Sequence, residues 1–551
     1  FMHSYLKQWL KDNPDTDVVC FTTFFYHFTL IFNNLGKEKF VDWFGYGASV
    51  SVAALEAFAE EKGYRLRAED IVDEGYYNST FRTPSKAYLD YIDFIQAFVA
   101  REAKKLVDEV HDAGKEAMMF LGDNWIGTEP YGPYFEQIGL DAVVGSVGGG
   151  ATLRMISDIP HVKYTEGRFL PYFFPDVFRE GNDPTIEANK NWLSARRAIM
   201  RNPVDRIGYG GYLSLAYKFP KFVDYIEHVT DEFREIYDIV KHTKPYTGLK
   251  VAILNAWGRL RTWQAHMVAH ELPYKQIYSY LGIMEALSGA SVDVSFISFD
   301  DGVAEGVDVS INAGDAGTSF SGGEVWKNET LITRIREFVY NGGGFVGVGE
   351  PTAVHHQGRF FQLGDILGVE REMGYSLSTD KYFTKELKEH FIIEDIEDVH
   401  KIDFGENIKN VYGLTSATEV LEFSNPKVSA GGVEEGIVLP ANAEGKEFGE
   451  IHLAANPYGK GRGVYIAGLP YTPENTRLLM RALFYAANKE SELTKWYASN
   501  PLVEVHAYPE KGVYAIVNNT NESQSTHVYD GEGVSRTVEL EPSEIRWEKI
   551  S

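Results

Sequence analysis

The residues best suited to chemistry are Asp123 and Trp125, within residues 116–130, EAMMFLGDNWIGTEP. A carboxylic acid can protonate a glycosidic oxygen, and an indole ring offers a flat apolar face to a pyranose. The pair therefore favours chemistry on a sugar. The alternative is that Asp123 only caps a helix or turns a loop, and the spacing alone favours neither interpretation.

The elements predicted around this pair indicate how it is held. Residues 117–121 are an apolar run that predicts a short buried strand, which stops at Gly122 directly before the acid. A helical pattern from about residue 85 to residue 111 precedes it, with Gly114 and Lys115 as the turn. An acid at the C-terminal end of such a strand is how a (β/α) barrel presents its catalytic residues.

A second stretch, residues 164–176, follows another predicted strand and contains a carboxylate, a guanidinium and several aromatic rings. We expect it to reach the same rim of the barrel as the acid. Arg168 could bind an anion there, and Tyr172 or Phe174 could stack on a sugar. The alternative is an Arg–Glu ion pair beneath a packed aromatic cluster.

The composition limits the class of protein. The formal net charge of −26 over 551 residues argues against a nucleic-acid or anionic-membrane partner, because either would need a basic face. The one cysteine, Cys20, excludes an internal disulfide and a multi-cysteine metal site, and it suits a reducing compartment. No apolar run approaches the roughly 20 residues of a membrane span.

The order of predicted elements divides the chain into three domains. Residues 1–245 alternate helical and strand-like segments, which predicts a mainly parallel sheet covered by helices, as in a (β/α) barrel. Residues 246–491 restart the alternation and predict an open, doubly wound α/β domain. Residues 492–551 change to short alternating strands, which predicts a small antiparallel β domain.

The first domain shows only about five strand-like runs, whereas a closed (β/α) barrel has eight. Either further strands escape the pattern, or the chain lacks the first part of the barrel. The sequence begins with Phe1-Met2-His3, which reads like the inside of an amphipathic helix. We therefore expect a barrel that is incomplete at its N-terminus.

Other motifs point to less chemistry. Residues 314–323 are rich in glycine and serine but match neither a Walker loop nor GxGxxG, so a plain βα turn is favoured. The adjacent His355 and His356 would point in different directions, and we expect loop histidines rather than a chelating pair. Because HExxH and clustered Cys/His spacings are absent from the sequence, no metal site is predicted.

The sequence that ends at Gly349-Glu350 lies where a glutamine-amidotransferase-like domain would place its nucleophile. That chemistry needs a cysteine thiolate, and the only cysteine lies far away in the sequence. We therefore expect the second domain to be catalytically silent and to serve in scaffolding or oligomerisation.

Three motifs, MMFLGDNWIGTEPYGPYF, EGRFLPYFFPDVF and INAGDAGTSFSGG, together resemble those of a known family. They are similar to the 1,3-β-galactosyl-N-acetylhexosamine phosphorylases, also called lacto-N-biose or galacto-N-biose phosphorylases, a group that includes galactosyl-rhamnose phosphorylases. The resemblance covers the whole chain. It implies a (β/α) barrel, a glutamine-amidotransferase-like middle domain, a C-terminal β domain, and a cytoplasmic homodimer.

By this resemblance the chain would cleave a β-galactoside with inorganic phosphate, inverting the anomeric centre to give α-galactose 1-phosphate. Phosphate would be a co-substrate, and no cofactor or metal is implied. Asp123 matches the general acid, beside Trp125 as a sugar contact. Arg168, Tyr172 and Phe174 fall in the segment that contacts substrate and phosphate.

Two features depart from the family's pattern. The family's enzymes are longer at the N-terminus, where the first barrel strands and further sugar contacts are expected. Cys20 stands at a position where relatives are expected to carry arginine, so that phosphate affinity would fall. The acceptor sugar (N-acetylglucosamine, N-acetylgalactosamine or rhamnose) stays open.

One acid suffices for phosphorolysis because phosphate is already an anionic nucleophile, whereas an inverting hydrolase needs a second carboxylate to activate water. Glu129 and Glu166 are the candidates for that second role. A hydrolytic β-galactosidase on the same architecture is therefore the nearest alternative. The other is a non-catalytic fragment that only oligomerises, because an open barrel edge would expose unpaired backbone.

Overall fold

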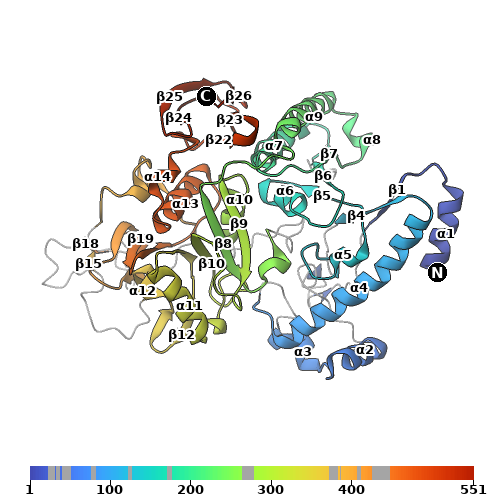
Figure 1. Ribbon diagram of the computed structural model, residues 1–551, viewed down its shortest axis with the longest axis horizontal. Coiled ribbons are helices and arrows are strands. Elements are labelled where there is room, and N and C mark those ends of the chain that lie inside the picture. The colour runs from blue at the N-terminus through green and yellow to red at the C-terminus, as the bar shows by residue number, and fades with distance from the viewer. Residues whose placement is uncertain are drawn as a thin grey trace.

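The structure is a computed structural model that describes residues 1–22, 31–32, 38–39, 51–75, 82–121, 127–169, 177–263, 278–371, 383–384, 386–405, 411–424, 447–448 and 450–550. Three groups of strands follow one another along the chain, and helices cover the first two groups (Figure 1).

The N-terminal part contains a five-stranded, all-parallel sheet in the order β1-β4-β5-β6-β7. Its strands are β1 (Val18–Phe21), β4 (Glu116–Leu121), β5 (Ala142–Val147), β6 (Tyr164–Phe169) and β7 (Arg206–Tyr209). The short strands β2 (Ile31–Phe32) and β3 (Glu38–Lys39) pair antiparallel in a separate sheet. The five strand-like runs of the sequence correspond to the five strands of the larger sheet, although their predicted ends differ.

Helices follow most of these strands. They are α1 (Met2–Asp12), α2 (Val52–Lys62), α3 (Ala68–Val72), α4 (Lys86–Asp112), α5 (Phe135–Ile138), α6 (Gly150–Ser157), α7 (Pro184–Ile199), α8 (Leu213–Ala216) and α9 (Pro220–Val240), with the short 3₁₀ turn η1 (Asp73–Gly75).

The helix α4 shows how this region folds. It begins at Ser85, whose Oγ accepts a hydrogen bond from the Tyr88 N–H at 3.1 Å, as an N-cap residue does. Its buried apolar side chains recur every three or four residues, at Ile92, Ile95, Val99, Ala103, Leu106 and Val110. Gly114, at φ 72°, then provides the left-handed turn that leads into β4.

The two faces of this sheet have different surroundings, because side chains alternate along a strand. Val19, Met119 and Val143 belong to the main core together with residues of α4. On the other face, Met118, Ala142 and Val144 form a small separate cluster next to Phe120 and Tyr164. We call this second face the inner face. By strand alternation it also carries Cys20, Ser146, Glu166 and Arg168.

The middle part contains a seven-stranded sheet in the order β17-β19-β20-β11-β10-β8-β9. Its strands are β8 (Leu249–Asn255), β9 (Val292–Ser298), β10 (Val309–Gly314), β11 (Gly344–Gly349), β17 (Glu419–Ser424), β19 (Glu450–Tyr458) and β20 (Gly461–Ile466). Five strands run parallel, and β17 and β19 form an antiparallel edge. The main helices are α10 (Tyr278–Ser288), α11 (Glu329–Tyr340) and α13 (Pro473–Ala486).

Smaller elements complete this part. They are the pairs β12 (Ala353–His356) with β13 (Arg359–Phe361), β14 (Val369–Arg371) with β16 (Val411–Gly413), and β15 (Phe383–Thr384) with β18 (Glu447–Phe448), the helices α12 (Gly364–Leu367) and α14 (Glu490–Leu493), and the 3₁₀ turns η2 (Gly258–Arg261), η4 (Glu324–Lys327), η6 (Phe391–Ile393) and η7 (Val399–Lys401). Among the described helices, none combines the length and the apolar character that a membrane span requires.

The C-terminal part consists of two three-stranded antiparallel sheets. One is β21 (Tyr497–Ala498), β24 (Gln524–Tyr529) and β25 (Ser535–Leu540), and the other is β22 (Val503–Tyr508), β23 (Val513–Asn518) and β26 (Ile545–Lys549), with η8 (Pro509–Lys511) between β22 and β23. These sheets lie beside both α7 and α13 (Figure 1). Arg196 of α7 donates to the Ser543 carbonyl at 2.9 Å, and Arg477 of α13 donates to the Ala498 carbonyl at 2.6 Å.

Candidate active site

The C-terminal ends of the parallel strands define one rim of the first sheet. The strands β4, β5, β6 and β7 end at Leu121, Val147, Phe169 and Tyr209. Parallel strands bring their C-terminal ends to the same edge, so the segments that follow them begin there. The predicted strand before the acid is confirmed, since β4 ends one residue before Gly122.

Several predicted site residues lie outside the described residues. These are Asp123 and Trp125, which follow β4, and Tyr172 and Phe174, which follow β6. What the structure describes is the strand that precedes each pair. In the sheet β5 lies between β4 and β6. The segments that follow β4 and β6 therefore begin at the same rim, with one strand between them.

Arg168 lies on β6 and is partly exposed on the inner face. Its Nη2 donates to Ser146 Oγ at 2.7 Å, and its guanidinium carbon lies 4.4 Å from the centre of the Phe120 ring. The backbone of Gly210 runs so close that an added Cβ would lie 1.3 Å from the Arg168 Cγ. The side chain is therefore fixed by a hydrogen bond, a ring contact and a steric wall.

Cys20 occupies the first strand of the same sheet, opposite Met118 in register, and its neighbours cover it only in part. Partial burial raises the pKa of the thiol, and the negative charge of Glu166 raises it further. The thiol is therefore neutral near pH 7 and contributes no charge to an anion site. The same interaction places the carboxylate of Glu166 within electrostatic reach of β1.

Glu129, one candidate for a second carboxylate, is 3% exposed. Its Oε1 lies 3.6 Å from Nη2 of Arg261, which stacks over Trp257 with 4.9 Å between the guanidinium carbon and the ring centre. Burial raises the pKa of Glu129 to about 7, against the opposing charge of Arg261. A carboxyl so enclosed is poorly placed to hold an attacking water. Its partner comes from the middle part of the chain, so sequence spacing gave no signal for the pair.

The glycine- and serine-rich motif after β10 forms contacts that stabilise the fold. Residues 315–323 form turns after β10, as predicted, and the Ala316 N–H donates to Glu350 Oε2 at 2.8 Å. Arg371 Nη1 lies 2.9 Å from the other oxygen of Glu350. Glu350, at the position where an amidotransferase-like domain would carry its nucleophile, therefore holds a turn.

The expectation that the adjacent histidines lie in a loop is wrong, because both belong to strand β12 of a hairpin. Because the register of this hairpin shifts between Ala353 and His356, the expectation that the two histidines point apart stays a prediction. Within the ranges that the structure describes, no group of three or more His, Cys, Asp or Glu side chains could hold a metal ion.

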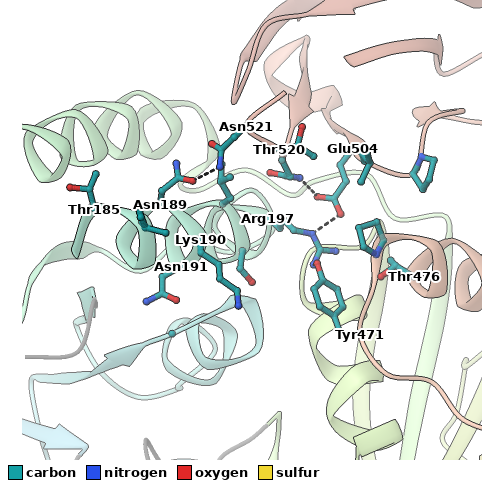
Figure 2. A pocket seen from close by; sticks show the side chains of 18 of the residues that line it. Thr185, Asn189, Lys190, Asn191, Arg197, Tyr471, Thr476, Glu504, Thr520 and Asn521 are labelled. Atoms are coloured by element: carbon teal, nitrogen blue, oxygen red, sulfur yellow. Dashed lines mark hydrogen bonds and ion pairs between the residues drawn. The ribbon is translucent and has the colours of Figure 1, made fainter. Parts of the chain in front are cut away.

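A cavity of about 800 Å³ lies where α7 meets the middle and C-terminal parts (Figure 2). Arg197 at its base pairs with Glu504 at 2.7 Å and donates to the Tyr471 hydroxyl at 2.7 Å. At the side, Asn521 Nδ2 donates to Asn189 Oδ1 at 2.7 Å. These groups bind one another across the junction of the three parts, and the cavity lies along α7 and reaches Gly148, which follows β5.

Comparison with known proteins places the chain in a family. Three family models match: the lacto-N-biose phosphorylase N-terminal TIM barrel domain at residues 1–248, the central domain at 250–491 and the C-terminal domain at 496–548.

Curated relatives cover nearly all of the chain. A 1,3-β-galactosyl-N-acetylhexosamine phosphorylase of Lachnoclostridium phytofermentans is 55% identical over 547 residues, which are 98% of this chain and 72% of the relative. One of Bifidobacterium longum subsp. longum is 51% identical over 569 residues, 99% of this chain and 74% of the relative. A D-galactosyl-β-1→4-L-rhamnose phosphorylase of L. phytofermentans is 35% identical over 541 residues, 96% of this chain and 70% of the relative. With its three parts matched in order, the chain belongs to the lacto-N-biose phosphorylase family.

Proposed function

We propose that this protein cleaves a β-galactosyl disaccharide of the lacto-N-biose or galacto-N-biose type with inorganic phosphate. The products are α-galactose 1-phosphate and an N-acetylhexosamine. The observation that carries this proposal is the identity of 55% and 51% to two 1,3-β-galactosyl-N-acetylhexosamine phosphorylases over nearly the whole chain. The lower identity of 35% to the galactosyl-rhamnose enzyme favours an N-acetylhexosamine over rhamnose as the acceptor.

In the proposed reaction Asp123 is the general acid. A phosphate oxygen attacks the galactosyl C1 from the face opposite the glycosidic oxygen, and the C1–O bond breaks. The bonding electrons go to the glycosidic oxygen, which takes the Asp123 proton, so that the acceptor leaves as a neutral alcohol. The end of β4 lies at the rim, and Asp123 follows it by two residues in the sequence, which supports this role.

Arg168 is proposed to orient the phosphate. A guanidinium offers planar donors that match a phosphate, and Ser146 and Phe120 hold the plane of this one on the inner face. Trp125, Tyr172 and Phe174 are proposed as sugar contacts, since aromatic faces suit the apolar side of a pyranose. Phosphate enters as a co-substrate, and the proposed reaction uses no other cofactor.

The same proposal covers the organisation of the chain. We divide it into a catalytic barrel at 1–245, a glutamine-amidotransferase-like domain at 246–491 and a β domain at 492–551. The parallel order of β8 to β11 and the structural use of Glu350 support a middle domain without chemistry of its own. An exposed free thiol at Cys20 suits the reducing cytoplasm, where we place a homodimer of this chain.

Incubation with lacto-N-biose, with and without phosphate, tests the function. We expect α-galactose 1-phosphate, and only when phosphate is present. Asp123→Asn should lower the rate by a factor of about 10² to 10⁴, which general acid catalysis typically contributes, while the fold is unchanged by circular dichroism. Free galactose released at the same rate without phosphate would instead support the hydrolase alternative.

A further inference from the structure

The start of α6 is held by a side chain from the neighbouring part of the chain. The N–H groups of Gly150 and Ala151 donate to the two carboxylate oxygens of Glu285 at 2.9 and 3.0 Å. Ser194 of α7 donates its hydroxyl to the same carboxylate at 2.6 Å. Glu285 belongs to α10, so one carboxylate joins three helices. The first N–H groups of a helix lack partners within the helix, and a negative charge there is favourable.

Glycines at the start of α6 allow this close approach. A Cβ on Gly150 would lie 2.2 Å from Ser288 Oγ, which also belongs to α10. A Cβ on Gly149 would lie 3.2 Å from a Glu285 oxygen. The backbone of the α6 start therefore lies directly against α10, and the contact leaves little room for either side to move.

The segment that Glu285 holds leads directly to Arg168. The N–H groups of Gly148 and Gly149 both donate to Thr152 Oγ1 at 3.0 Å, which closes the loop between β5 and α6. Ser146 lies on β5 two residues before this loop, and its Oγ accepts the hydrogen bond from Arg168 at 2.7 Å. A shift at the start of α6 is thus passed to the group that orients the guanidinium.

We propose that Glu285 is a positioning residue for phosphate binding. It touches no reacting atom, and it acts by fixing the start of α6, the β5–α6 loop and through them the Ser146 hydroxyl that orients Arg168. The middle domain thereby contributes to the reaction without supplying a catalytic group. This inference rests on the proposed function, because it takes Arg168 to be the phosphate contact.

Glu285→Gln tests the inference, since the amide keeps the shape of the side chain but replaces one acceptor oxygen by an NH₂ group. That group cannot accept the hydrogen bond of a backbone N–H, which is left unpaired. We expect the KM for phosphate to rise roughly tenfold, the range that follows from one lost charge-assisted hydrogen bond. The KM for the disaccharide should change by less than about twofold.

Three further variants sharpen the test. Glu285→Asp keeps the charge on a shorter side chain and should recover part of the phosphate affinity. Ser194→Ala removes one of the donors to Glu285 and should raise the same KM to a smaller extent. Glu337→Gln, at an exposed position on α11, is the matched control and should behave as the wild type.

The outcomes separate the inference from the function on which it rests. An unchanged phosphate KM in Glu285→Gln, or an equal rise in both KM values, would overturn the positioning role. If Glu285→Gln does not fold, the two KM values of Ser194→Ala are compared instead. An unchanged phosphate KM, or an equal rise in both, would again overturn the positioning role. A wild-type protein without phosphate-dependent cleavage would refute the proposed function itself, before any variant is compared.

Discussion

At the residue scale, Cys20 contributes no charge to the inner face. Its thiol stands on β1, and both partial burial and the charge of Glu166 raise the pKa of the thiol. A neutral thiol offers no charge to a phosphate ion. The proposal therefore assigns the phosphate contact to the guanidinium of Arg168. Arginine is also the residue expected at position 20 in relatives.

Cys20→Arg should therefore strengthen phosphate binding. A guanidinium at position 20 adds a charge-assisted contact on the inner face, and we expect the KM for phosphate to fall by about five- to tenfold. Initial rates at varied phosphate concentration measure this change. Cys20→Leu supplies bulk without charge and should give no such gain, and an equal effect of both variants would contradict the electrostatic argument.

Glu129 links stability to pH. Its pKa of about 7 in the folded protein lies above the ordinary value of 4.5, because the carboxyl is buried. Between these two values the unfolded chain has lost the proton while the folded chain retains it. The stability that this group contributes is therefore complete below about pH 4.5 and falls by about 3 kcal/mol as the pH rises through 7.

Glu129→Gln should remove this pH dependence, because the amide mimics the neutral carboxyl. We expect melting temperatures close to those of the wild type near pH 5, and an increasing advantage of the variant towards pH 8. Differential scanning calorimetry across this range measures the difference, with Glu337→Gln as the exposed control. A difference that stays constant with pH would show that Glu129 does not titrate there.

At the scale of elements, the end of β7 forms the wall that confines Arg168. Register pairs Arg168 with Gly208, and the chain continues into Gly210, whose N–H donates to the Phe169 carbonyl at 3.4 Å. At Gly210 the missing side chain makes room for the stem of the arginine. The need for glycine is thus steric at this position.

Gly210→Ala should displace Arg168, because the new Cβ would lie 1.3 Å from Cγ and 1.8 Å from Cδ of the arginine. We expect the kcat/KM for phosphate to fall by at least about tenfold, since a misplaced contact group costs transition-state binding. Gly208→Ala is the matched control, since no heavy atom lies within 4 Å of its added Cβ. Equal activity of the two variants would contradict the close packing.

Local patterns in the sequence predict many of the helices and strands. The apolar run of β4, the periodic helix α4 and the alternating strands of the C-terminal part each follow from side chains adjacent in the sequence. The helix α6 escapes prediction because it begins at Gly150, the last of three glycines, which indicate a loop. Likewise, the sequence of β19 predicts a strand, but it does not predict that this strand pairs antiparallel with β20.

Contacts between distant segments could not be predicted in this way. Arg261 and Glu285 reach the N-terminal part from the middle part of the chain, and no spacing or motif connects them with Glu129 or Ser194. The positions Asp123, Trp125, Tyr172 and Phe174 stay predictions, since they lie outside the described residues. The sequence does predict the strands that precede these residues, β4 and β6.

At the scale of the whole molecule, α7 holds the three parts together through buried arginines. Arg197 is 3% exposed and pairs with Glu504 of β22 while it donates to Tyr471 of the middle part. Arg196, fully buried, donates to carbonyls of the C-terminal part. Charges so far from water need their partners, so the parts are fixed in one arrangement around α7.

Arg197→Met should destabilise this junction, because it leaves the partly buried Glu504 carboxylate without its main partner. Breaking a buried pair from one side typically costs about 3–5 kcal/mol, so we expect the melting temperature to fall by several degrees. Arg234→Met removes an exposed ion pair with Asp231 and should change the melting temperature little. Equal small effects of both variants would contradict a junction that depends on the buried charge.

The central claim is that phosphate, and not water, attacks the galactosyl carbon. Cleavage of lacto-N-biose in ¹⁸O-labelled water with unlabelled phosphate tests it most directly, with the sugar products analysed by mass spectrometry. The account predicts galactose 1-phosphate that carries no ¹⁸O. Free galactose with one ¹⁸O atom, formed as the main product, would contradict it.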